Sequence, residues 1–287
     1  MRTTERLRAG GMGSQRRNAH GVSALAQTQL PEAARAVHSL LRDDHCDAQA
    51  RAQAFVSMGL ETLNPPMEAV DELIRIGRTR SEYPGAEQMA TTNLGAMASL
   101  QRARHPEITA KIVADIGDRL DHDTGDPLFN ALMGASNTNE KSLLPKVEAH
   151  LQDKATEPRA AAWSALTGMP YEAVLARFDA LLLLAQANQM EHRLFEALAN
   201  GAQQSQSAPP ANVMEAVLAL YPKVSPEHST MPLHLTQLIA AAWAKSPNDA
   251  ILLAAMRAKF QEALKGQHKQ MMQQLVAIAG LNTLMAP

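Results

Sequence analysis

The densest group of residues that could ligate a metal or act as nucleophiles is the segment Asp43-Asp44-His45-Cys46-Asp47. Carboxylate, imidazole and thiolate groups together can bind a transition metal. A solvated turn between two helices explains the same residues, because acidic turns of this kind recur along the chain. We favour the turn, and the sequence predicts no metal at this segment.

A second acidic group, Asp121, Asp123 and Asp126, offers the oxygen ligands that Ca²⁺ prefers. The spacing does not fit an EF-hand loop, since Gly125 comes one position early and Leu132 stands where the bidentate glutamate belongs. Weak calcium binding by several oxygens is the alternative. The prediction is again that no metal is bound.

Five arginines are candidates for a phosphate-binding surface: Arg75, Arg78, Arg80, Arg102 and Arg104. The first three end one predicted helix, and the last two follow the next helix, which runs back by about 20 Å at 1.5 Å per residue. The two groups are therefore expected at opposite edges. The net charge of −2 also divides unevenly, with +4 in residues 1–20, +3 in residues 257–287 and −9 between them. Because phosphate binding needs clustered cations, no nucleic-acid partner is expected.

No motif for catalysis or cofactor binding was found elsewhere. The segment Gly10-Gly11-Met12-Gly13 follows no strand and precedes no Gly-Lys-Ser/Thr, so it is not a phosphate loop. The HExxH, GxSxG and CxxC motifs are absent, and His45 beside Cys46 in sequence does not establish a catalytic pair. The sequence predicts a protein that is not an enzyme, with no catalytic residue, cofactor or metal.

The composition is that of a globular chain, with 287 residues of which 46% are hydrophobic and 3% aromatic. The single cysteine, Cys46, excludes an internal disulfide, and the N-terminus has no apolar signal segment. The longest apolar-rich run without charge, Met231 to Ala244, is shorter than the ~20 residues that span a bilayer. We expect a cytoplasmic protein without a transmembrane segment; a misplaced start codon that removes a signal is the alternative.

Nearly all of the chain has the apolar periodicity of helices, and no segment alternates with period two. Prolines stand where helices are expected to begin, since the first helical turn has no internal partner for its N–H groups: Pro65, Pro66, Pro106, Pro170 and Pro232. Residues 1–22 lack the periodicity and are rich in glycine, so a flexible tail is predicted there.

Four segments share a pattern of small residues, apolar residues and a glycine late in a helix. Their glycines, Gly59, Gly95, Gly134 and Gly168, are separated by 36, 39 and 34 residues. This period is typical of two-helix repeats, each with a helix A, a short turn and a helix B, that bury their apolar stripes by stacking. Aspartates in the A-to-B turns at 40–47, 119–127 and 150–158 are expected to cap helix B.

The repeats resemble HEAT-type α-solenoid repeats over roughly 47–170, most clearly at 129–170. The resemblance implies an all-α, right-handed α-α superhelix. We predict HEAT-like repeats at 23–200, a linker or long loop at 201–210 and a C-terminal helical region continuing the solenoid at 211–287. The segment 129–170 is also similar to the helical superhelix of vitellogenin-like large lipid transfer proteins. That family wraps β-sheets around lipid, and this sequence has no strand pattern with which to build them.

The favoured function is a non-catalytic scaffold whose concave face, formed by the B helices, binds a protein or peptide. Met58, Asn93, Asn130 and Trp163 are repeat-equivalent, so those that face solvent would line one surface, although packing is their expected role. The alternative is the helical part of a lipid-transfer-like assembly, with lipid as the partner. A HEAT-like enzyme acting on nucleic acid ranks third.

The tryptophans and the C-terminal methionines each have two interpretations, burial in the core or a functional role. Trp163 and Trp243 lie in predicted helices at core-compatible spacing, and we favour the core for both. Met256, Met271, Met272 and Met285 enrich the last 32 residues. Methionine fills irregular gaps in cores, which is the favoured role, but an uncovered methionine-rich helix face would be a docking surface.

Overall fold

The computed structural model describes residues 12–43, 46, 48–79, 85–224, 230–246, 249–265 and 269–278. Most of the described residues are helical, and none is in a strand. The prediction of an all-α fold is therefore confirmed. Among the helices that the structure describes, none is both long and apolar enough to cross a bilayer.

The chain divides into two compact units, the first ending at Gly168 and the second beginning at Met169. The linker or long loop predicted at 201–210 lies inside the second unit. Residues 201–204 belong to helix α13 (Glu191–Gln204), and α13 packs on α15 (Met231–Lys245), which follows this segment. The polar composition of 201–210 thus marks a surface loop at 205–210 rather than a division between units.

The helices of the first unit are, in chain order, α2 (Met12–Gln27), α3 (Pro31–Leu41), α4 (Ala48–Val56), the π-helical turn η1 (Ser57–Glu61), α5 (Met67–Arg78), α6 (Ala86–Gln101), α7 (Pro106–His122), α8 (Gly125–Thr138), the 3₁₀ turn η2 (Lys141–Leu143), α9 (Leu144–Ala149), α10 (Thr156–Ala165) and the 3₁₀ turn η3 (Leu166–Gly168).

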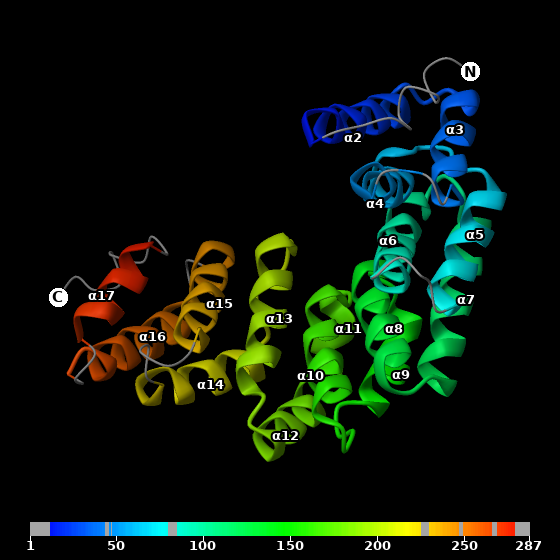
Figure 1. Cartoon of the computed structure of the whole chain (residues 1–287). Helices are drawn as coiled ribbons and strands as arrows, with labels where there is room; N and C mark the ends of the chain where they lie inside the picture. Colours follow the sequence, from blue (N-terminus) through cyan, green and yellow to red (C-terminus); the bar gives the residue numbers. More distant parts are fainter. Residues whose placement is uncertain are drawn as a thin grey trace. The chain divides into compact units, whose positions relative to one another are not determined.

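These helices form two layers (Figure 1). In the A layer, α3 contacts α5, α5 contacts α7 and α7 contacts α9. In the B layer, α4 contacts α6, α6 contacts α8 and α8 contacts α10. The core between the layers contains fully buried side chains from both, including Leu73, Leu94, Ile112, Leu132 and Trp163. Alternation of A and B helices along the chain is compatible with a helical-repeat solenoid.

The flexible tail predicted for 1–22 differs from the structure, because α2 begins at Met12; residues 1–11 lie outside the described part. Glycines at 13 and 21 lower the helix propensity of this segment. Tertiary packing supplies the stability instead, since Val22 and Ala26 are buried and Ser23 Oγ donates a hydrogen bond to Glu61 Oε1 at 2.9 Å.

The prolines expected at helix starts are found there: Pro106 opens α7, Pro66 directly precedes α5 and Pro232 is the second residue of α15. The expected aspartate caps are wrong for α8 and α10, which begin after Thr124 and Ala155 with no side-chain cap. Asp153 Oδ1 accepts a hydrogen bond from the N–H of Ala155 at 3.0 Å, outside the helix. Asp47, ahead of α4, lies outside the described residues.

The second unit contains α11 (Tyr171–Leu175), α12 (Phe178–Asn188), α13, α14 (Ala211–Leu220), the 3₁₀ turn η4 (Tyr221–Lys223), α15, α16 (Ala250–Ala263) and α17 (Lys269–Ile278). Phe178 and Phe195 meet edge to face, with ring centroids 6.4 Å apart. Met256 is buried, as its core interpretation predicts, whereas Trp243 is only partly buried. Met285 and the side chains of Met271 and Met272 lie outside the described part.

Candidate functional site

The four repeat glycines lie at close contacts between successive segments of the B layer. A Cβ on Gly59 would lie 2.7 Å from Asn93 Cβ, and one on Gly134 would lie 3.0 Å from Thr91 O. A Cβ on Gly95 would overlap the carbonyl oxygen of Gly134. Gly168 meets the carbonyl oxygen of Ser136 in the same way. The repeat period therefore corresponds to a physical contact at each step of the B layer.

The repeat-equivalent residues Met58, Asn93, Asn130 and Trp163 are all buried. The indole N–H of Trp163 donates to the carbonyl of Leu151 at 3.1 Å, which satisfies its one polar atom. Packing, rather than ligand contact, is therefore the role of these four side chains in the structure.

A different set of residues leaves one open stripe on each of three adjacent B helices. The members are exposed or partly exposed and recur at three- or four-residue steps: Gln88, Thr92, Ala96 and Ser99 on α6, Phe129, Met133 and Ser136 on α8, Ala160 and Ser164 on α10, and Thr167 in the turn η3 that follows α10. We call these ten residues the B face. The side-chain amide of Asn137 joins two of the helices by donating to the carbonyl of Thr92 at 3.1 Å.

These ten residues are uncharged, and the same steps along two of the helices begin at exposed carboxylates, Asp126 on α8 and Glu157 on α10. In the A layer, by contrast, charged residues join each helix to the next. Arg42 beyond α3 binds Glu72 of α5 at 2.9 Å, and Arg78 of α5 binds Asp118 of α7 at 2.8 Å. Two further pairs extend these contacts, Lys111 with Asp71 and Lys146 with Asp121.

The candidate arginines are thus engaged at separate places. Arg75 shares Glu72 with Arg42, at 2.8 Å. Arg102 lies at the end of α6 and donates to the carbonyl of Thr138 at 2.6 Å. Arg80 is outside the described residues. Arg104 is exposed beyond the end of α6. The other described candidate arginines bind different groups: Glu72, Asp115 and Asp118, and the carbonyl of Thr138.

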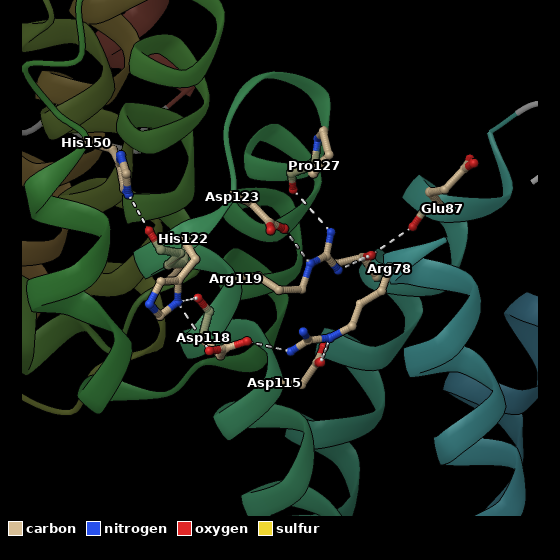
Figure 2. A network of polar contacts seen from close by, with 11 residues as sticks. Arg78, Glu87, Asp115, Asp118, Arg119, His122, Asp123, Pro127 and His150 are labelled. Atoms are coloured by element: carbon tan, nitrogen blue, oxygen red, sulfur yellow. Dashed lines mark hydrogen bonds and ion pairs between the residues drawn. The ribbon is translucent and has the colours of Figure 1, made fainter. Parts of the chain in front are cut away.

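Arg119 is buried at the centre of a polar network that joins α6, α7 and α8 (Figure 2). It donates from Nη1 to Thr91 Oγ1 at 2.8 Å, from Nη2 to the carbonyl of Pro127 at 3.2 Å, and from Nε to Asp123 Oδ2 at 3.0 Å. Gly77 makes room for this arrangement, since a Cβ there would lie 2.8 Å from Thr91 Oγ1. The network holds three helices together.

The acidic group considered for calcium is dispersed over other partners. Asp123 is the counter-ion of Arg119, Asp121 pairs with Lys146, and Asp126 is exposed in the first turn of α8. Of the segment 43–47, only Asp43 and Cys46 are described. Among the described residues, no group of three or more His, Cys, Asp or Glu side chains is placed to hold a metal.

Asp115 is the carboxylate in Figure 2 whose pKa is raised by burial. Its Oδ1 accepts from Arg78 Nε at 2.6 Å, but its Oδ2 is buried without a hydrogen-bond partner. Burial raises the pKa of Asp115, and Arg78 opposes the shift. The neighbouring Asp118 is exposed, and its hydrogen bond from Arg78 lowers the pKa of that carboxyl.

Sequence reasoning missed the pairing of Arg78 with Asp115. The signal that could have revealed it is their separation of 37 residues, which is one repeat period. The same applies to Arg102 and Thr138, which are 36 residues apart.

The chain matches no protein-family model, and no curated protein sequence matches it. Among solved structures, the crystal structure of an engineered protein from the Northeast Structural Genomics Consortium is similar over 99% of this chain and 78% of that protein. The two share 17% sequence identity with a TM-score of 0.46, and we base no argument on this similarity.

Proposed function

We propose that this protein is a non-catalytic scaffold, a right-handed HEAT-like superhelix whose B helices form a concave face that binds a protein or peptide. The observation that carries the proposal is the contrast between the two layers. Ion pairs join successive A helices, whereas the ten residues of the B face are uncharged and the exposed carboxylates beside them, Asp126 and Glu157, lie only in the first turns of α8 and α10.

The side chains of the B face suit a polypeptide ligand. Thr92, Ser99, Ser136, Ser164 and Thr167 offer hydroxyl groups that both donate and accept hydrogen bonds. Phe129 and Met133 are partly exposed beside them and can pack against apolar side chains.

The test is site-specific photo-cross-linking in the native host. A photoreactive residue is placed at Ser136 or Ser164 on the B face, and at Glu107 in the A layer as a matched exposed control. We expect one discrete protein adduct from the two B-face positions and none from position 107. Adducts from position 107 alone, or no protein adduct at all, would contradict the proposal.

The two other functions make distinct predictions for native mass spectrometry of the same protein. Lipid-sized additions of heterogeneous mass would favour the lipid-transfer-like assembly, for which another chain would have to supply the sheets. Nucleic-acid adducts would favour the third function. Neither has a specific observation in its favour among the described residues.

A further inference from the structure

One arginine of the A layer is shared between two carboxylates that lie in opposite surroundings (Figure 2). Arg78, the last residue of α5, donates from Nε to Asp115 Oδ1 at 2.6 Å and from Nη2 to Asp118 Oδ2 at 2.8 Å. Both aspartates belong to α7, but the side chain of Asp118 is 51% exposed and that of Asp115 only 6%. We call these three residues the α5–α7 joint. In it, one positive charge serves two negative charges, one of which is inside the fold.

The buried carboxylate of the joint is only half satisfied. Asp115 Oδ2 is buried and has no hydrogen-bond partner among the described residues. A buried ionised oxygen without a donor loses the hydration that it has in the unfolded chain. Arg78 compensates only part of this loss, because its side chain is 44% exposed and is shared with Asp118. The ionised form of Asp115 therefore costs stability.

No other nearby cation supplies the missing donor. The charged groups that act on Asp115 are Arg78 from α5, and Asp118 and Arg119 from α7. The other helices that contact α7, namely α6, α8 and α9, add none among their described residues. The three guanidinium nitrogens of Arg119 donate to groups other than Asp115. His122 Nδ1 lies 3.2 Å from Asp118 Oδ1, so this histidine acts on the exposed carboxylate.

The two carboxylates of the joint respond to acid in opposite directions. Burial raises the pKa of Asp115 above its ordinary 3.8, against the influence of Arg78, whereas the hydrogen bond from Arg78 lowers the pKa of Asp118. A raised pKa means that the folded state holds the proton more tightly than the unfolded state does. The cost of ionised Asp115 is therefore present in full above the raised value, falls as pH falls through it, and is gone below 3.8.

We propose that Asp115 makes the α5–α7 joint acid-responsive: when its buried carboxyl takes up a proton, an uncompensated charge disappears, Arg78 is left to Asp118, and the packing of α7 on α5 becomes more stable. Arg78 and Asp115 are 37 residues apart, which is one repeat period, so the device acts on the connection between two neighbouring repeats. The joint lies in the A layer, and the proposal does not rest on the function of the B face.

The test compares Asp115→Asn with Asp118→Asn, two neutral replacements of similar shape at carboxylates that share one arginine. Urea denaturation of the full chain is followed by Trp163 fluorescence in a Trp243→Phe background between pH 7 and pH 4. At pH 7 we expect Asp115→Asn to lower the equilibrium constant of unfolding at least ~3-fold, because a neutral amide is cheaper to bury than an incompletely paired charge. This gain should shrink as pH falls. Asp118→Asn is the matched control and should give no gain at pH 7.

A second measurement does not depend on the stability of either asparagine variant. The side-chain carboxyl signals of the wild type are titrated by ¹³C NMR and assigned by their loss in the two variants. We expect the Asp115 carboxyl to titrate above 3.8 and the Asp118 carboxyl below it. In Arg78→Met, the Asp115 carboxyl should titrate at a still higher pH, because the cation that opposes the shift has been removed.

Three outcomes would overturn the proposal. One is an Asp115 carboxyl that titrates at or below 3.8 in the wild type. Another is a loss of stability in Asp115→Asn at pH 7, or a difference from the wild type that stays constant down to pH 4, since either would make Asp115 an ordinary ion-pair partner. The third is an Asp115 titration that Arg78→Met leaves unchanged, which would show that the arginine is not shared as described.

Discussion

The two layers of the first unit join successive repeats by different physical means. In the A layer, charged side chains reach across one repeat period, as Arg78 does to Asp115 and Asp118. In the B layer, glycines allow backbones to approach, as Gly95 does with Gly134. Ion pairs at a surface are adjustable and weak, whereas backbone contact is intolerant of any added atom. The A layer should therefore accept substitutions that the B layer rejects.

The strongest test of this difference is Gly95→Ala. The added Cβ overlaps a carbonyl oxygen rather than a flexible side chain, so we expect a loss of about 3 kcal/mol in the free energy of unfolding. The measurement is urea denaturation in a Trp243→Phe background, where the fluorescence of Trp163 reports on the first unit alone.

The matched control is Gly117→Ala in the A-layer helix α7. There the new Cβ would lie 3.4 Å from Leu143 Cδ2, an ordinary contact, and replacing a helical glycine gains up to about 1 kcal/mol. Equal losses for the two variants would show that the layers do not differ as described.

The next largest effect is expected for Arg119→Met, which removes the centre of the network in Figure 2. Three acceptors, on Thr91, Asp123 and Pro127, lose their donor, and we expect a loss of about 2 kcal/mol in the free energy of unfolding. If Arg119→Met leaves the free energy of unfolding unchanged in the same denaturation, the network does not bind the two layers together.

A smaller, pH-dependent effect is expected for Glu72→Gln. Hydrogen bonds from Arg75 and Arg42 lower the pKa of Glu72 below its ordinary 4.5. A carboxyl with a lowered pKa stabilises the fold above its ordinary pKa, and this contribution is lost as pH falls through the lowered value. We expect the variant to be about 1 kcal/mol less stable at pH 7, since the two arginines are exposed. The difference should shrink below pH 4.5; a constant difference across this range would contradict the assignment.

The smallest effect is expected for Lys111→Ala, which breaks an ion pair between two exposed side chains. We expect a loss of at most about 0.5 kcal/mol in dilute buffer, and none in 1 M NaCl, where the Debye length is about 3 Å. Denaturation at both salt concentrations measures this. A larger loss that salt leaves unchanged would show that the A layer, like the B layer, depends on contacts that salt does not screen.

Much of the first unit followed from periodicity in the sequence. The glycine spacing predicted the repeats, and the prolines at 66 and 106 predicted the starts of α5 and α7. Helix α2 was missed because its stability comes from burying Val22 and Ala26, which local propensity does not record. The aspartates were assigned to caps because Asp favours them, yet Asp123 pairs with Arg119, which lies four residues earlier at the end of α7. The burial of Arg119 depends on packing against other helices, which the sequence does not show.

The candidate surfaces were harder to predict than the fold. Asn93 and Asn130 are polar residues on B helices, and their burial depends on which side of each helix meets its neighbour. The contact between Gln101 and the carbonyl of Thr62 was not predicted either, because only the fold brings these residues together. Contacts between residues one repeat apart would show both which side of each helix is buried and which turns meet.

The glycine contacts of the B layer also limit how the length of this chain can change. A helix turns by about 100° per residue, so one residue inserted in α6 or α8 would rotate Gly95 or Gly134 away from its neighbour and present a side chain in its place. Insertions are compatible with stacking only in the connections between helices. During divergence, the chain would therefore gain or lose residues in its loops, or gain or lose whole repeats.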